Sequence, residues 1–149
     1  MAVIGAGTAD RQEYDQAHRL GQLLAEQGYI LICGGLGGIM EAAASGASSR
    51  GGEVVGLLPG EDVRAANPFV TRAIATGLGH MRNYLVVLNA GAAVALGGGY
   101  GTLSEIALAK KIGRPVIVLG GWSGLEGTVT ADGPEQAVRM IGELLPDGP

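Results

Sequence analysis

The fold is decided by residues 92–105, which read AAVALGGGYGTLSE. The first five, Ala92–Leu96, are apolar throughout, a pattern typical of a strand that is buried on both faces. Gly97–Thr102 then predicts a tight glycine turn, and the apolar spacing of Leu103–Ile112 predicts a helix. A strand, a glycine loop and a helix in this order form the repeating unit of an open parallel sheet, whose ligands bind beyond the carboxyl ends of the strands.

Similar strand and helix patterns lie on both sides of this unit. Strands are expected at Ala2–Ile4, Tyr29–Cys33, Glu53–Leu58, Phe69–Ala75 and Pro115–Leu119, helices at Arg11–Gln27, Ile39–Ser49, Met81–Leu88 and Pro134–Leu145, and loops at Glu61–Pro68 and Gly120–Gly133. This alternation predicts the α/β class, a Rossmann-like doubly wound parallel sheet with helices on both faces. We expect a single domain over residues 1–149, because no linker is evident and the length is too short for a barrel of eight strand–helix units.

Charge and composition exclude several classes of protein. The formal net charge of −4 argues against a nucleic-acid partner bound by phosphate neutralisation. No run of 18 apolar residues occurs and the N-terminus does not read as a signal peptide, so a membrane partner is not expected. Cys33 is the single cysteine and is expected to be a buried, inert thiol. Since no metal-ligand spacing is present either, we expect a cytoplasmic protein without a metal site.

The turn at Gly97–Thr102 has the properties of a phosphate-binding loop. Glycines allow positive φ angles and a close approach of the ligand, while the following helix points free N–H groups and its positive end at an anion. Three consecutive glycines also cost conformational entropy that a plain turn avoids, which favours a ligand over a purely structural turn. We therefore expect a phosphate-bearing small molecule as partner, with no required cofactor. The predicted contacts in this loop are Gly97, Gly98, Gly99, Gly101 and Thr102.

Two further glycine loops follow predicted strands. Residues 34–41 read GGLGGIME and share the pattern G-G-x-G-x-x-x-E with residues 98–105. This loop is less polar, so it is interpreted either as a ligand contact or as a packing turn. Gly5-Ala6-Gly7 begins a dinucleotide-binding fingerprint that lacks its third glycine, but it lies at the expected ligand edge of the sheet. The candidate ligand residues of the two loops are Gly7, Thr8, Gly34, Gly35, Gly37 and Gly38.

Glu105 and Arg82 each admit a functional and a structural interpretation. Thr102-Leu103-Ser104-Glu105 fits a capping box, in which Glu105 folds back on the helix N-terminus, and the alternative is a catalytic acid. Arg82 precedes the apolar segment Tyr84–Leu88, where a cation at a helix start opposes the helix dipole. This position indicates an anionic partner, and the alternative is an ordinary surface arginine. His80 is interpreted as a loop histidine rather than a proton carrier.

Two motifs resemble those of a known family. GGGYGTLSE at Gly97–Glu105 is similar to the P-G-G-x-G-T-x-x-E motif of the LOG ("Lonely Guy") family, whose members are often misnamed lysine decarboxylases. GHMRN at Gly79–Asn83 resembles that family's arginine motif, which usually reads M-x-x-R-K. The wider segments Gly77–Asn83 and Gly97–Ala107 match GLGHxRN and GGGxGTLSEIA, which are typical of the short bacterial branch with the molybdenum cofactor carrier proteins. The resemblance runs from Ala2 to Leu119.

The resemblance implies two alternative functions. LOG enzymes cleave the N-glycosidic bond of nucleoside 5′-monophosphates, and the resemblance makes Arg82 and Glu105 the catalytic pair. It also makes Gly98, Gly99, Gly101 and Thr102 the phosphate loop. The carrier branch instead binds the pterin phosphate of molybdenum cofactor without chemistry. Gly97 and Asn83 stand where LOG enzymes usually have proline and lysine, which favours a carrier over a hydrolase. A regulatory nucleotide sensor is a third alternative.

Apolar stretches predict that the protein forms an oligomer. Tyr84–Leu88 is an almost unbroken apolar run and Ile106–Ala109 is another. Large apolar patches left at a surface usually mark interfaces, and two-fold symmetry is the commonest arrangement. The family resemblance implies the same, so we expect a homodimer or homotetramer.

Overall fold

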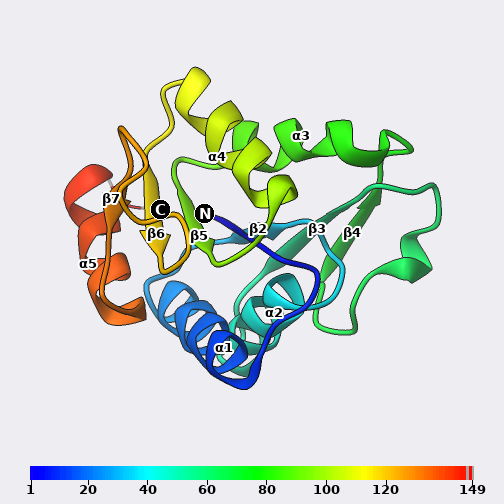
Figure 1. The fold of residues 1–149 in the computed structure, drawn as a ribbon. Coiled ribbons are helices and arrows are strands. Elements are labelled where there is room, and N and C mark those ends of the chain that lie inside the picture. Colours follow the sequence, from blue (N-terminus) through cyan, green and yellow to red (C-terminus); the bar gives the residue numbers. More distant parts are fainter. Residues whose placement is uncertain (147, 149) are drawn as a thin grey trace.

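A parallel sheet of seven strands forms within residues 1–146 and 148, the part of the chain that the computed structural model describes (Figure 1). The strands are β1 (Ala2–Gly5), β2 (Leu31–Cys33), β3 (Val54–Leu58), β4 (Arg72–Ala75), β5 (Ala93–Leu96), β6 (Val116–Leu119) and β7 (Val129–Thr130). Their spatial order is β4, β3, β2, β1, β5, β6, β7, and every neighbouring pair is parallel. In the central pair, Val3 lies opposite Val94 and Ile4 opposite Ala95.

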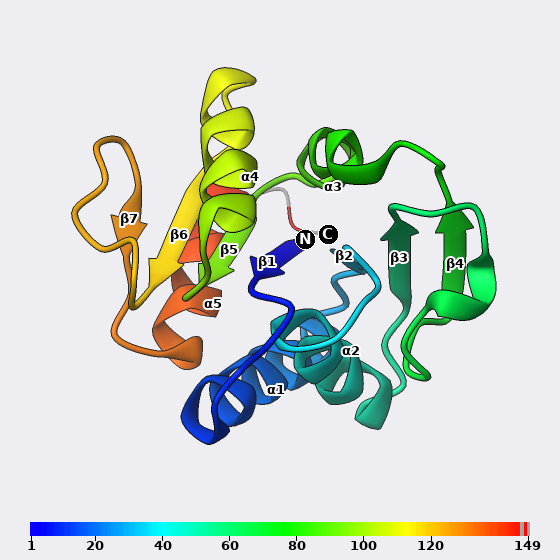
Figure 2. The ribbon, with the colours of Figure 1, turned by 45° about the vertical axis from the view of Figure 1, so that its right-hand side comes forward.

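Helices cover both faces of this sheet, so the predicted doubly wound, Rossmann-like α/β fold is confirmed (Figure 2). One face packs against α1 (Arg11–Glu26), α2 (Ile39–Ser49) and α5 (Pro134–Leu144). The other face packs against α3 (Asn83–Leu88) and α4 (Tyr100–Lys111). Two short 3-10 helices, η1 (Val63–Ala65) and η2 (Gly79–Arg82), lie in the connections. Among the described residues, no helix combines the length and the apolar character needed to cross a membrane.

The core divides into two aliphatic layers, one on each side of the sheet. Val3 and Val94 belong to the layer that contains α1, α2 and α5, whereas Ile4 and Ala95 belong to the layer that contains α3 and α4. Because strands covered on both faces bury all of their side chains, they read as continuous apolar runs. This is why the sequence indicated strands by apolar runs rather than by alternation.

Several element boundaries differ from the sequence-based prediction, and three of these differences are larger or lie near the carboxyl ends of the strands. Helix α4 begins at Tyr100, three residues before the expected Leu103, because Gly101 and Thr102 take helical conformation directly after the glycine turn. The expected helix Met81–Leu88 is divided into η2 and α3. The expected loop at Gly120–Gly133 contains the two-residue strand β7, which is too short to produce a periodic pattern.

The chain changes direction along the sheet between β1 and β5. The connection that leaves β1 enters α1 on one face, and the connection that leaves β5 enters α4 on the opposite face (Figure 2). The two connections therefore diverge from neighbouring carboxyl ends and leave a crevice between them. Ligands of open α/β sheets bind at this kind of switch point.

Candidate functional site

A pocket of about 300 Å3 lies at this switch point. Its lining comes from the loop after β1, the start of α2, the η2–α3 junction and the start of α4. The lining residues are Gly5, Ala6, Gly7, Met40, His80, Arg82, Asn83, Gly99, Gly101, Thr102 and Glu105. The pocket therefore brings together segments that are separated by up to a hundred residues in the sequence.

Arg82 and Glu105 face each other across this pocket without forming a hydrogen bond. Arg82 Nη1 and Glu105 Oε1 are 3.9 Å apart, and each side chain is only 8% exposed. A charge-assisted hydrogen bond between these groups would be about 2.7–2.9 Å long. Arg82 Nε also has no hydrogen-bond partner among the described residues. Both side chains thus retain polar atoms with which a bound molecule is able to form hydrogen bonds.

Burial controls the protonation of Glu105. Removal from water raises the pKa of this carboxyl to about 7, while the positive charge of Arg82 opposes the rise. Burial also lowers the pKa of Arg82, and the Glu105 carboxylate opposes that change. At neutral pH, Glu105 is therefore present in both the neutral and the ionised form. It is able to donate as well as to accept a proton.

Gly34 provides the space that the Arg82 guanidinium occupies. A Cβ atom added to Gly34 would lie 2.5 Å from Arg82 Nη2 and 2.6 Å from the sulfur of Met40. Real Cβ atoms do not approach other heavy atoms so closely. Gly34 therefore affects the site although it does not line the pocket. Because it has no side chain, the buried Arg82 guanidinium has room to point at Glu105.

Thr102 lies in the first turn of α4 and does not cap that helix. The N-cap residue is Gly99, so Thr102 is the third helical residue and Glu105 lies in the second turn. The capping-box interpretation of Glu105 is therefore wrong, because α4 begins three residues earlier than that motif requires. The Thr102 hydroxyl is buried and has no hydrogen-bond partner in the part of the chain that the structure describes. Glycine at the N-cap also leaves the first N–H groups of α4 without a side-chain cap.

Three of the four glycines that line the pocket face open space. A Cβ atom added to Gly7, Gly99 or Gly101 would meet nothing within 4 Å among the described residues. The φ angles of these three residues also lie outside the positive range. Neither packing nor backbone conformation therefore requires glycine at the three positions, and a ligand is able to approach the backbone there.

Two other loop glycines serve the fold itself. Gly38 has φ +64°, and an added Cβ would collide with the backbone of Ala6–Thr8. The N–H of Ile39 then donates to the carbonyl of Ala6 at 3.0 Å, so this loop is fastened to the loop after β1. Gly98 has φ +96°, and its Cβ would collide with the Thr102 side chain. These glycines shape the crevice without facing it.

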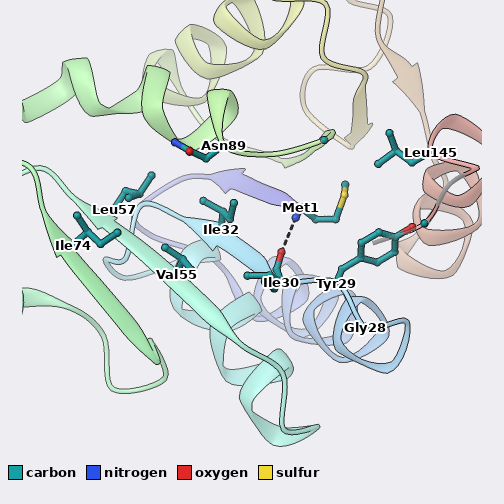
Figure 3. Close-up of a pocket in the computed structure, with 12 residues that line it drawn as sticks. Met1, Gly28, Tyr29, Ile30, Ile32, Val55, Leu57, Ile74, Asn89 and Leu145 are labelled. Atoms are coloured by element: carbon teal, nitrogen blue, oxygen red, sulfur yellow. Dashed lines mark hydrogen bonds between the residues drawn. The ribbon is translucent and has the colours of Figure 1, made fainter.

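A second pocket of about 560 Å3 lies away from the switch point (Figure 3). Ile32, Val55, Leu57 and Ile74 line it from the sheet, and Asn89 lines it from the end of α3. This pocket is mostly apolar and does not reach the glycine loops at the carboxyl ends of the strands. Among the described residues, no group of three or more His, Cys, Asp or Glu side chains is arranged to hold a metal ion.

Comparison with known proteins establishes the family. The model of the SLOG cluster4 family matches residues 1–143. The chain belongs to the SLOG cluster4 family. The predicted membership of the LOG and molybdenum cofactor carrier superfamily is thereby confirmed. Among relatives of this SLOG cluster4 protein, an uncharacterized protein of Archaeoglobus fulgidus is 48% identical over 139 residues, which are 93% of this chain and 91% of the relative.

Two solved structures of similar size share the fold. The molybdenum cofactor binding protein of Rippkaea orientalis has a TM-score of 0.92 and 36% identity, with 97% of this chain and 95% of that chain covered. The molybdenum cofactor carrier protein of Chlamydomonas reinhardtii has a TM-score of 0.89 and 32% identity, with 97% of both chains covered. A probable cytokinin riboside 5′-monophosphate phosphoribohydrolase of Oryza sativa subsp. japonica is 33% identical over 108 residues, which are 68% of this chain but only 47% of that protein.

The SLOG cluster4 chain brings about half of the predicted site residues together. Gly7, Gly99, Gly101, Thr102, Arg82 and Glu105 all line the switch-point pocket. Gly34, Gly35, Gly37, Gly38, Gly97 and Gly98 do not line it and pack closely on neighbouring segments, and Thr8 is exposed beside it. Arg82 is 7% exposed, so the surface-arginine interpretation is wrong.

Sequence reasoning missed Met40 as a lining residue and gave no role to Asn83. Met40 reads as an ordinary core residue at the start of α2, so no sequence signal distinguishes it. Asn83 directly follows Arg82 and is almost fully buried, although it is polar. Its departure from the LOG arginine motif was the available signal.

Proposed function

We propose that this SLOG cluster4 protein is a cytoplasmic carrier that binds a phosphate-bearing small molecule in the switch-point pocket. The expected ligand is a pterin phosphate of the molybdenum cofactor type, and the protein holds it without cleaving it. The similarity to the molybdenum cofactor binding protein of Rippkaea orientalis and the molybdenum cofactor carrier protein of Chlamydomonas reinhardtii supports this ligand class.

The observation that carries the proposal is the set of unused donors around one pocket. Arg82 Nε and the Thr102 hydroxyl are buried without hydrogen-bond partners among the described residues. The start of α4, with its uncapped N–H groups, lies beside them. Buried polar groups are almost always hydrogen-bonded, so a convergent set of free donors indicates a missing acceptor. A phosphate group supplies several strong acceptors, and its charge is favoured at a helix N-terminus.

The neutral and the ionised form of Glu105 suit the two candidate functions differently. A carboxylate beside the phosphate would repel it, whereas a neutral carboxyl is able to donate a hydrogen bond to it. Since burial raises the pKa of Glu105 to about 7, much of this side chain is neutral under physiological conditions. A hydrolase that stabilises a positively charged, oxocarbenium-like ribose would instead require the ionised form.

The alternative is a LOG-type phosphoribohydrolase that acts on nucleoside 5′-monophosphates. The closeness of Arg82 to Glu105 supports it, as does the similarity to the rice phosphoribohydrolase over part of that protein. In this case Glu105 would stabilise the ribose cation or activate water, and Arg82 would orient the carboxylate or the substrate.

We further propose that the protein forms a homodimer or homotetramer. The segment from η2 through α3 exposes Leu78, Met81, Tyr84 and Leu88 at spacings of three and four residues. Side chains at these spacings lie on one face of a helical segment, and a continuous apolar face favours contact with a second copy. In the second predicted stretch, Ile106 and Ala109 are buried against the sheet, whereas Ala107 is exposed and Leu108 is half-buried.

Base release from nucleoside monophosphates separates the two functions. We expect wild-type protein to release no free base from AMP at a typical enzymatic rate of roughly 1 per second, while it binds AMP or a pterin phosphate measurably. For a hydrolase, wild type would release base, and Glu105→Gln would lower turnover by orders of magnitude with nearly unchanged nucleotide affinity. Chromatographic detection of free adenine, combined with calorimetric titration, measures both quantities.

A further inference from the structure

We propose that Asn83 and Ser104 are positioning residues, which keep Arg82 and Glu105 apart so that both remain free for a ligand. The role in ligand binding rests on the proposed function, because the ligand is the molecule expected in the switch-point pocket. The separation of Arg82 from Glu105 is a property of the protein without ligand, so it is measurable independently.

Two neighbouring side-chain pairs lie between the η2–α3 junction and the first turns of α4. Arg82 and Asn83 are neighbours in the chain, and so are Ser104 and Glu105. Asn83 Nδ2 donates a hydrogen bond to Ser104 Oγ at 2.9 Å, while the adjacent pair Arg82 and Glu105 stays 3.9 Å apart. Asn83 and Ser104 are therefore hydrogen-bonded, whereas Arg82 and Glu105 are not. Both pairs lie between the start of α3 and the first turns of α4.

The bonded pair continues to the backbone of the glycine loop. Ser104 Oγ donates to the carbonyl of Gly101 at 2.7 Å, three residues earlier in α4. In an α-helix the same carbonyl accepts the N–H of Glu105. Gly101 lines the pocket and has open space in front of it. These two hydrogen bonds, from Asn83 to Ser104 and from Ser104 to Gly101, thus link the residue next to Arg82 to the first turn of α4, which carries the free N–H groups.

A spacer is needed because the unliganded charges attract each other. Opposite charges in a buried site interact more strongly than in water, so Arg82 and Glu105, now 3.9 Å apart, favour closure into a hydrogen-bonded ion pair. Closure would pair the guanidinium internally and remove it from the ligand. Asn83 is 7% exposed, and its hydrogen bond to Ser104 fixes the separation of the two helix starts next to the charged pair. The free state is thereby held ready for an anion.

The surroundings of Glu105 contain few other ionisable groups. Arg82 faces it from η2, Cys33 lies nearby at the end of β2, and His80 lines the same pocket. The Cys33 thiol has its pKa raised to about 11 by burial, so it is neutral throughout the physiological range. Apart from burial, the titration of Glu105 therefore depends mainly on the distance to Arg82.

The test uses Asn83→Ala, Ser104→Ala and the conservative variant Ser104→Thr. Two matched controls come from the same chain. Asn89 lies at the end of α3 and donates to the Leu85 carbonyl at 2.7 Å, and Ser49 Oγ donates to the carbonyl of Gly46 at 2.7 Å with the same three-residue spacing. Asn89→Ala and Ser49→Ala remove side-chain hydrogen bonds of similar length at residues that do not line the switch-point pocket. Carboxyl carbon NMR of Glu105 without ligand, AMP affinity by calorimetry and melting temperature are measured for all variants.

We expect Asn83→Ala and Ser104→Ala to shift the titration of Glu105 to lower pH, because Arg82 closes on the carboxylate. AMP affinity should fall by about 5- to 10-fold in both, as for the loss of one hydrogen bond of ordinary strength. Ser104→Thr should restore both values, and the two controls should change neither. Variants that melt earlier but keep the wild-type titration and affinity would overturn the proposal. Failure of wild type to bind both AMP and a pterin phosphate would count against the proposed function, while the ligand-free titration would still decide whether Asn83 and Ser104 keep Arg82 and Glu105 apart.

Discussion

At the scale of single residues, Glu105 determines how the site responds to pH. Its pKa of about 7 in the folded protein lies above the ordinary value of 4.5, since burial penalises the charged form. The folded state therefore holds this proton more tightly than the unfolded state does. The contribution of Glu105 to stability is complete below pH 4.5 and is lost as the pH rises to about 7.

Replacing Glu105 by glutamine should remove this pH dependence. We expect Glu105→Gln to unfold with a similar free energy to wild type near pH 4.5 and to be more stable above pH 7. The difference should approach roughly 3 kcal/mol, since each pKa unit corresponds to about 1.4 kcal/mol. Urea unfolding between pH 4.5 and 8.5 measures it, and parallel curves for the two proteins would contradict the assignment.

Physical reasoning on the sequence predicted the glycine turn at Gly97–Thr102 but not the pairing of Arg82 with Glu105. The glycine turn and the following helix are local features, so they are visible in the sequence. The 22 residues between Arg82 and Glu105 include a complete strand, and no local rule places the side chains of Arg82 and Glu105 together. Only the family resemblance connected them. The space that Gly34 leaves for Arg82 depends on a contact between β2 and η2, which the sequence alone does not reveal.

At the scale of elements, the start of α4 combines glycines of two kinds. Gly98 takes a positive φ angle and contacts Thr102, so the fold requires it. Gly101 lies in the first turn of α4 and faces open space, so the fold does not require it. Sequence inspection could not separate these roles, because both residues belong to the same motif. The early start of α4 and the short strand β7 were missed for a similar reason, since glycine-rich segments carry no apolar period.

Alanine substitutions should separate stability from binding at these two positions. We expect Gly101→Ala to raise stability by about 0.5–1 kcal/mol, because alanine favours a helix, and to weaken AMP binding, because its Cβ enters the pocket. Gly98→Ala should lower stability by about 1–3 kcal/mol through backbone strain and the collision with Thr102. Thermal unfolding and calorimetry measure the two effects. If Gly101→Ala binds AMP as tightly as wild type, ligand does not approach the backbone there.

At the scale of the whole molecule, the sheet brings loops from both halves of the chain to one crevice. The predicted order of strands and helices was sufficient to establish this architecture. Buried parallel strands read as continuous apolar runs, whereas in helices the apolar residues recur every three or four positions. The surface available to a partner was harder to predict. Burial of Ile106 depends on how α4 packs on the sheet, and exposure of Met81 depends on the division of its helix into η2 and α3.

The exposed apolar face of η2 and α3 should support an oligomer. We expect light scattering to give at least twice the 15.0 kDa mass of one chain at micromolar concentration. Leu88→Lys together with Met81→Lys should lower the mass toward a single chain, because two charges would be buried in the contact. A matched pair of lysines at the exposed positions Ser48 and Gly142 should leave the mass unchanged. A wild-type mass near 15.0 kDa would contradict the oligomer.

A crystal structure of the protein with AMP tests the central claim most directly. We expect phosphate density on the backbone N–H groups of Gly98–Thr102, with the Thr102 hydroxyl and Arg82 turned toward the bound molecule. These are the groups that have free donors in the unliganded pocket. Phosphate density solely at another place, with the start of α4 blocked by side chains, would contradict it.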